Sequence, residues 1–439
     1  MHITIIAIGS RGDVQPYMAL SQGLLRAGHQ VRLATHSTFE KLIASYGLDF
    51  YPIDDEPREL FEGDEGTRLL NAQSNALLFA YRLRQYLTPR MDLYMQRSLQ
   101  ACQDADVIFS SYMSFLIAYS VAEKLQRRIV ATFLQPSLLP TQEFAEPTSP
   151  WLPQWPEHIR KTFNEQSHLA AGKFFWYLFS PAINSGRQRL YQLPPLPKES
   201  LYATLPEHVD LILLGYSPLL LPKAQDWSEK IQVTGFWTLE AVPGWQPEPG
   251  LVEFLQAGPP PVYIGFGSMN SQRPSRTLEL SIKALEQAGQ RGIILTNRET
   301  LGEQRLTRDI YITNGVPHDW LFPRMSLIVH HGGAGTVAAS LRAGVPSLTV
   351  YHISDQRFWG NLVARAGAGL PPMSRRWLTS LRLARAIQSA QADPSLRQRA
   401  RALGDQLRQE RGTDQAIHAL QHHLMPLQTQ RTTPPITQR

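Results

Sequence analysis

The sequence predicts an α/β protein of two facing Rossmann-like domains with parallel sheets and a ligand cleft between them. The chain has 439 residues, more than one core usually accommodates, so two domains of roughly 200 residues each are expected. Strand–helix–strand units, from which parallel sheets are built, open the chain and recur from residue 261. Such sheets bind ligands at the carboxyl ends of their strands, so facing sheets share one cleft.

The first half of the chain alternates short apolar runs with helix-forming segments. Its predicted elements are, in order, a strand at 2–8, a turn at 9–14, a helix at about 16–27, and strands at 30–34, 107–110 and 129–133, with a helix at about 115–125 between the last two. The segment from Gln135 to Tyr191 is rich in proline and aromatic residues. It is interpreted either as a core beneath irregular loops or as a site for a lipophilic compound.

The second half repeats this architecture. Its predicted elements are strands at 262–266, 292–296, 327–330 and 347–351, with helices at 276–288 and from 336 onward. We predict an N-terminal acceptor-binding domain at 1–222, a C-terminal nucleotide-sugar-binding domain at 223–427 and a polar tail at 428–439. The last helices are candidates to pack back on the first domain.

Composition excludes several classes of protein. The single cysteine, Cys102, cannot form an internal disulfide and suits a reducing compartment. There is no apolar run of about 18 residues and no basic leader, so we expect a cytoplasmic protein. The arginine-rich stretch at 397–411 is either a solvated helix face or a surface for anionic lipid, which leaves peripheral membrane contact open. No pattern typical of nucleic-acid binding is present.

The most informative segment, from Ser326 to Ala343, is predicted to be a buried strand, a glycine-rich turn and a helix. Glycines allow a tight turn and close approach of a ligand. A helix that begins there directs unpaired N–H groups and the positive end of its dipole at that ligand, which favours phosphate. The candidate diphosphate contacts are His330, His331, Gly332, Gly333 and Gly335.

The loop between the first strand and first helix, GSRGDVQP at 9–16, lies where open α/β sheets place functional groups. Asp13 is either the N-cap of the helix or a carboxylate general base in the cleft. Taken alone, Arg11 is interpreted as a surface charge. Ser10 and Arg11 nevertheless remain candidate contacts to the acceptor or donor.

Three further candidates lie in the second half. Ser268, in a small-residue loop, is a candidate hydrogen-bond donor to phosphate. The backbone at Val316, with His318 nearby, is a candidate for binding a nucleobase edge. Asp355 and Gln356 follow the strand at 347–351, and a carboxylate with an amide can hold several hydroxyl groups of a sugar.

Two motifs suggest other chemistry. Residues 333–338 fit the dinucleotide-binding pattern G-x-G-x-x-A, and Asp355 follows the glycines at the spacing expected of the acidic residue in that pattern. Asp355 lies four residues past its strand, however, whereas the acidic residue of the pattern stands at the end of the strand. Residues 104–106, Asp-Ala-Asp, imitate a metal site of some sugar transferases but precede a strand instead of following one. We interpret the second motif as a helix-to-strand connection.

Together these motifs resemble those of the GT-B glycosyltransferases, particularly the sterol glucosyltransferase-like group and its relatives that glycosylate glycopeptide and macrolide antibiotics. The matching motifs are GSRGDVQP at 9–16, GFGS at 265–268, VPHDWLF at 316–322, HHGGAGT at 330–336, SLRAGVPS at 340–347 and DQ at 355–356. The resemblance implies a GT-B architecture in which the C-terminal domain binds a nucleotide sugar and the N-terminal domain binds the acceptor.

The resemblance also implies roles for individual residues. Asp13 matches the catalytic base, where related plant enzymes have histidine. Asp355 and Gln356 match the donor-sugar contacts. Gly315 stands where the plant donor motif has a tryptophan that stacks on uracil. The residues that match phosphate contacts are His330, Gly333, Gly335 and Thr336.

The implied activity is inverting transfer of a hexose from a nucleoside diphosphate sugar, UDP-glucose in our expectation, to a hydroxyl of a sterol or other lipid. We expect no metal and no cofactor beyond this co-substrate. The alternatives are a glycosyltransferase of a polyketide or peptide natural product and a nucleotide-sugar epimerase on the same fold. A nicotinamide-dependent oxidoreductase and a non-catalytic sugar-nucleotide or lipid-binding protein also remain open.

Overall fold

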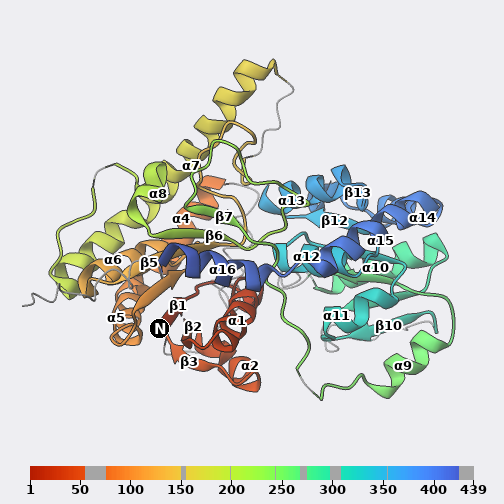
Figure 1. Ribbon diagram of the computed structural model, residues 1–439. Coiled ribbons are helices and arrows are strands. Elements are labelled where there is room, and N and C mark those ends of the chain that lie inside the picture. Colours follow the sequence, from red (N-terminus) through yellow and green to blue (C-terminus); the bar gives the residue numbers. More distant parts are fainter. Residues whose placement is uncertain are drawn as a thin grey trace, which may run out of the picture.

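The computed structural model describes residues 1–54, 76–149, 155–197, 199–242, 244–266, 274–296, 308–352 and 354–424. Two parallel sheets form two lobes that lie side by side (Figure 1). Among these residues, the first sheet has the spatial order β3 (Asp49–Pro52), β2 (Gln30–Thr35), β1 (His2–Ile6), β4 (Val107–Ser110), β5 (Arg128–Phe133), β6 (Leu211–Leu214) and β7 (Ile231–Val233). The second has the order β10 (Ile310–Thr313), β9 (Gly292–Leu295), β8 (Val262–Gly265), β11 (Leu327–His330), β12 (Ser347–Tyr351) and β13 (Gly369–Ser374).

All neighbouring strands in both sheets are parallel, which confirms the predicted α/β class. The central strands are buried over their whole length because helices cover both faces of each sheet. The helices of the first lobe are α1 (Arg11–Arg26), α2 (Glu40–Ser45), α4 (Ala76–Leu87), α5 (Met91–Ala101), α6 (Phe115–Leu125), α7 (Glu157–Gly186) and α8 (Leu205–His208). Those that follow are α9 (Pro249–Gln256), α10 (Pro274–Ala288), α11 (His318–Leu321), α12 (Ala334–Arg342), α13 (Ser354–Arg365), α14 (Ser380–Gln391), α15 (Pro394–Gln409) and α16 (Gly412–Leu424).

The crossing between the lobes lies further along the chain than the boundary predicted at 222/223. Strand β7 pairs with β6 and is the last strand of the first sheet, because buried Ile231 completes the core beside it. At the other end of the chain, Ile417 and Leu420 of α16 share a buried cluster with Leu20 and Leu24 of α1. The C-terminal helix therefore packs back on the first lobe. The tail at 428–439 lies outside the described residues.

Aromatic side chains join the two lobes. Trp359 of α13 is fully buried, and its ring centroid lies 5.9 Å from that of Tyr216, which follows β6. Phe358 of the same helix lies 6.4 Å from Phe144 of the first lobe. The lobes are thus in direct apolar contact at one end of the cleft.

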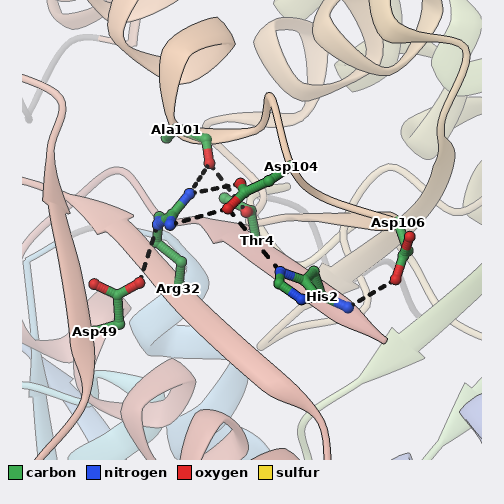
Figure 2. Close-up of polar contacts among 7 residues, drawn as sticks. All are labelled: His2, Thr4, Arg32, Asp49, Ala101, Asp104 and Asp106. Atoms are coloured by element: carbon green, nitrogen blue, oxygen red, sulfur yellow. Dashed lines mark hydrogen bonds and ion pairs between the residues drawn. The ribbon is translucent and has the colours of Figure 1, made fainter.

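The Asp-Ala-Asp motif has a structural role (Figure 2). Arg32 donates to both carboxylate oxygens of Asp104, at 2.7 and 3.2 Å, and to Asp49 at 3.0 Å. Asp106 accepts a hydrogen bond of 2.8 Å from the backbone N–H of His2. These contacts join the amino ends of neighbouring strands, on the edge opposite the cleft. The structure thus confirms the helix-to-strand interpretation.

Candidate active site

Loops from both lobes meet where the strands end. Strand β1 leads into α1, while β11 and β12 lead into α12 and α13 of the second lobe. Burial and the charge of Asp13 raise the pKa of Asp355 to about 6. Burial and the charge of Arg11 lower the pKa of His318 to about 4. Helix α1 also packs against α12 of the second lobe, so the start of α1 lies beside that lobe at the cleft.

Asp13 projects into this cleft from the first turn of α1. Ser10 is the N-cap residue, so Asp13 is not, as the sequence had left open. The backbone N–H and the hydroxyl of Ser10 both donate to Oδ2 of Asp13, at 2.8 and 2.9 Å. Among the described residues none bonds to Oδ1, and the side chain is exposed. Although the residue is exposed at the surface of the cleft, the protein groups around its carboxyl reduce its hydration and raise its pKa, and the Ser10 hydrogen bonds partly offset this.

The turn before α1 requires a glycine. Gly9 has a φ of +148°, and a Cβ there would lie 2.5 Å from Oδ2 of Asp13. The absence of a side chain lets the carboxylate fold back over the turn. The helix itself begins at Arg11, five residues before the start predicted at about residue 16, because the proline within it does not prevent the first turns from forming.

Two residues behind this loop were missed in the sequence. The N–H of Gly9 donates to Nε2 of His36 at 3.3 Å, and Nδ1 of His36 lies 2.6 Å from Asp54. Asp54 also accepts from the backbone N–H of Ser37 at 2.8 Å. His36 follows β2, the neighbour of β1, so its position at a strand end was the available signal. This pair supports the loop that carries Asp13.

The glycine-rich turn has the predicted form. Gly332 has a φ of +95°, and a Cβ there would lie 2.6 Å from Cγ2 of Thr349 and 2.9 Å from the backbone oxygen of Gln356. Gly333 is the N-cap of α12 and has no side-chain cap, so the first amides of the helix lack an internal partner. Gly335 is exposed and Thr336 is half-buried in the same first turn. The start of α12 is thus suited to an anion.

Both histidines of the turn lie beside these amides and are neutral at pH 7. Burial lowers the pKa of His330 to about 3 and that of His331 to about 4. Nδ1 of His330 accepts from the N–H of Gly332 at 3.0 Å, so Nε2 carries the proton. That atom is buried and has no partner among the described residues. His331 is half-buried over Gly333 and is the histidine nearer the cleft.

Asp355 and Gln356, the predicted sugar contacts, are in different environments at the start of α13. Asp355 is half-buried and faces Asp13 through the charge interaction described above. Gln356 is buried, and its Oε1 accepts from the backbone N–H of His352 at 2.8 Å. The structure thus presents the carboxylate to the cleft, while the amide oxygen holds the preceding turn.

The remaining candidates lie at the same edge of the second sheet. The ring of His318 stacks on Phe322 at 4.2 Å, and Val316 is half-buried beside the same cluster. Ser268 lies outside the described residues. Among the residues that are described, no group of three or more His, Cys, Asp or Glu side chains is placed to hold a metal ion.

A narrow apolar cavity with a free volume of about 20 Å³ lies in the first lobe. Helices α4 to α7 supply most of its wall, and Ile8, the residue before Gly9, lines the end next to the Asp13 loop. The buried hydroxyl of Tyr112 has no partner among the described residues. The aromatic side chains of the wall are Tyr94, Tyr112, Phe175, Phe179 and Tyr202.

Two family models match the chain. Residues 3–141 match the glycosyltransferase family 28 N-terminal domain, and residues 285–417 match the C-terminal domain of erythromycin biosynthesis protein CIII-like proteins. The first contains the Asp13 loop and the second contains the glycine-rich turn. The two matches therefore fall on the two sides of the cleft.

Relatives match nearly the whole chain. A sterol 3-beta-glucosyltransferase of Arabidopsis thaliana is 32% identical over 97% of this chain and 68% of its own length. A sterol 3-beta-glucosyltransferase of Komagataella phaffii is 32% identical over 95% of this chain and 34% of its own length. Among solved structures, the spinosyn forosaminyltransferase is similar with a TM-score of 0.67, 16% identity and coverage of 96% and 98% of the two chains. The calicheamicin glycosyltransferase has a TM-score of 0.64 and 17% identity, with coverage of 97% and 98%.

Proposed function

Because this chain belongs to the glycosyltransferase family that includes the sterol 3-beta-glucosyltransferases, we propose that it transfers glucose from UDP-glucose to the hydroxyl group of a sterol or a similar lipid. One observation carries the proposal. The exposed carboxylate of Asp13 on one lobe faces Asp355 and the amide-rich start of α12 on the other. A base and an anion-binding turn on opposite sides of a cleft are what an in-line displacement at a sugar requires.

Asp13 acts as the general base in this proposal. Ser10 occupies Oδ2 and fixes the orientation of the carboxylate, while Oδ1 accepts the proton of the acceptor hydroxyl. The hydroxyl oxygen attacks the anomeric carbon as the bond to the diphosphate breaks, and the configuration inverts. General-base assistance of this kind contributes roughly 10²–10⁴-fold to the rate.

The second lobe stabilises the leaving diphosphate. Its negative charge lies at the start of α12, where unpaired amides and the helix dipole present a positive potential. The imidazoles of His330 and His331 are neutral there and contribute N–H donors in place of a full charge. Asp355 accepts hydrogen bonds from hydroxyl groups of the sugar.

The lining of the cavity in the first lobe supports a lipophilic acceptor, which has to part helices α4 to α7 because the free volume is only about 20 Å³. The cavity is lined by apolar and aromatic side chains and reaches Ile8, next to the loop of the base. Burial of an apolar ring system there gains roughly 25 cal/mol per Å² removed from water. The unpaired hydroxyl of Tyr112 offers one polar contact within this wall.

The decisive experiment measures release of UDP from UDP-glucose with and without a sterol, and identifies the product by mass spectrometry. We expect release that depends on the sterol, with one hexose added per product molecule. Release without any acceptor would indicate hydrolysis or the epimerase alternative. Transfer to polar alcohols alone would overturn the lipid acceptor.

A further inference from the structure

The outward face of α7 is apolar where it meets solvent. Tyr177 is 71% exposed and Phe174 is 40% exposed, and Ala170 and Pro181 extend this exposed stripe at helical spacing. The opposite face of the same helix is also apolar and is buried in the core, through Trp176, Phe179 and Ile183. A helix that is apolar all round normally has a partner on each side. Among the residues that the structure describes, the inner side is covered and the stripe is exposed.

A neighbouring helix extends this face. Helix α4 packs against α7, and its Tyr81 is 58% exposed. Figure 1 shows α7 running along the outer side of the first lobe, with its first turns projecting beyond the body of the protein. The exposed rings of Tyr81, Phe174 and Tyr177 thus belong to two helices that pack against each other. We call the surface made by Tyr81, Lys173, Phe174 and Tyr177 the α4–α7 face.

The exposed charged side chains beside these rings are basic. On α4, exposed Arg84 lies one helical turn from exposed Tyr81. From 166 to 186, Lys173 is the only Lys, Arg, Asp or Glu residue, and it is exposed. Exposed aromatic rings beside basic side chains match the interface of a bilayer, where rings insert at headgroup level and cations meet anionic lipid. A soluble acidic partner would match the charges but not the stripe of rings.

The same two helices also line the apolar cavity. Leu87 of α4 and Phe175, Phe179 and Ile183 of α7 contribute to its wall. One side of this helix pair thus faces the proposed acceptor cavity, and its other side carries the exposed rings. A lipid acceptor dissolves in a bilayer far better than in water.

We propose that the α4–α7 face docks on a membrane that contains anionic lipid, from which the acceptor enters the adjacent cavity. The entry step rests on the proposed function, whereas docking on the membrane does not. Docking places the aromatic stripe of α7 in the headgroup region and leaves the second lobe in water, where it meets the nucleotide sugar.

The test is sedimentation of the full chain with vesicles of phosphatidylcholine, with or without phosphatidylserine, in the absence of sterol and nucleotide. We expect binding to the anionic vesicles that weakens as salt is added. The double variant Phe174→Glu/Tyr177→Glu should bind at least about tenfold more weakly, because two apolar contacts are lost. The matched control is Trp377→Glu, since Trp377 is a ring of the second lobe that is 63% exposed and should not affect binding.

A charge variant covers the case in which the double variant fails to fold. Lys173→Gln should weaken binding to the anionic vesicles roughly fivefold and leave any binding to neutral vesicles unchanged. Unchanged binding of either variant, or an equal loss in Trp377→Glu, would overturn the proposal. Self-association in analytical ultracentrifugation that the double variant abolishes would assign the face to a second copy of the chain.

Activity separates the docking proposal from the proposed function. Sterol offered in cyclodextrin should be glucosylated equally by the wild type and the double variant, whereas sterol in vesicles should react at least about tenfold more slowly with the variant. If no sterol reacts in either form while vesicle binding persists, the acceptor assignment fails and docking stands. If the variant is equally fast with both forms, delivery from the membrane is wrong.

Discussion

At the scale of single residues, the site depends on carboxyl groups in unfavourable surroundings. Burial raises the pKa values of both Asp13 and Asp355, and the two charges face each other. Such clustering is typical of functional sites because stability alone does not favour it. Asp104 and Asp106 show the opposite case in the same chain. Arg32 donates to Asp104 and the N–H of His2 donates to Asp106, so both carboxylates have structural partners.

Replacement of the base tests the mechanism. We expect Asp13→Asn to lower kcat by roughly 10²–10⁴-fold, because the amide keeps the shape of the carboxylate but cannot accept the proton. Affinity for UDP, measured by calorimetry, should stay within about twofold because this side chain does not bind the diphosphate in our account. Wild-type turnover in this variant would remove Asp13 from its proposed role.

Asp355 should make the stability of the ligand-free protein depend on pH. Its pKa is about 6 in the folded protein, against 3.8 as the ordinary value, so the folded state binds the proton more tightly than the unfolded chain. The free energy of unfolding should therefore fall as pH rises from about 4 to about 6. Asp355→Asn should remove a cost of about 1–2 kcal/mol above that window, after allowance for solvent in the cleft.

Thermal denaturation at a series of pH values checks this expectation. Below about pH 4 the variant and the wild type should unfold at similar temperatures, because the carboxyl is protonated in both states. Above about pH 6 the variant should unfold at the higher temperature. A difference that does not change with pH would contradict the raised pKa of Asp355 in the folded protein.

At the scale of elements, two turns position the chemistry, and each one depends on a glycine. Gly9 leaves room for the carboxylate of Asp13, and Gly332 lets the turn before α12 pack against β12 and α13. Strand ends and glycine turns were readable in the sequence because both are local. The atoms that would meet a Cβ at Gly332 belong to Thr349 and Gln356, which are distant in sequence, so this packing was not readable.

Gly332 and Gly335 form a matched pair for a test. Gly332→Ala should destabilise the fold by about 1–3 kcal/mol and weaken UDP binding, because of its positive φ and the 2.6 Å approach to Thr349. Gly335→Ala should not destabilise it, since a Cβ there meets nothing within 4 Å and alanine favours the helix. Denaturant titration of both variants measures the difference. Equal destabilisation would show that the turn is not built as described.

The His36–Asp54 pair should affect catalysis through the loop it supports. We expect His36→Ala to lower kcat about tenfold or more with little change in the KM for UDP-glucose, because the N–H of Gly9 loses its acceptor and Asp13 is less well fixed. His36→Gln, which can keep an acceptor near that N–H, should recover part of the rate. Full activity in His36→Ala would leave this pair with a purely structural role.

At the scale of the whole molecule, the site exists only because two lobes share one cleft. Ring contacts such as Trp359 with Tyr216 hold the lobes together, and α16 returns from the second lobe to pack on α1. Within the described helices, none is both long and apolar enough to cross a bilayer. In the function we propose, assembly of the site from two halves also places donor and acceptor on opposite sides.

This arrangement predicts transfer without a metal ion. The amides at the start of α12, the neutral histidines beside them and Arg11 across the cleft are the groups proposed to balance the diphosphate charge. We therefore expect full activity after dialysis against EDTA, measured as UDP release. Loss of activity that added Mg²⁺ restores would contradict this account.

Local patterns in the chain were enough to predict the parallel α/β architecture, the glycine-rich turn before α12 and the loop of Asp13, because apolar period, glycine turns and strand ends are local properties of the chain. It also indicated the family, whose motifs lie in such loops. Tertiary structure alone decided that β7 belongs to the first sheet, that Gln356 turns inward, that His36 supports Gly9 and that Asp13 faces Asp355. These facts depend on which distant segments pack together, and side-chain partners and electrostatic shifts arise only from that packing.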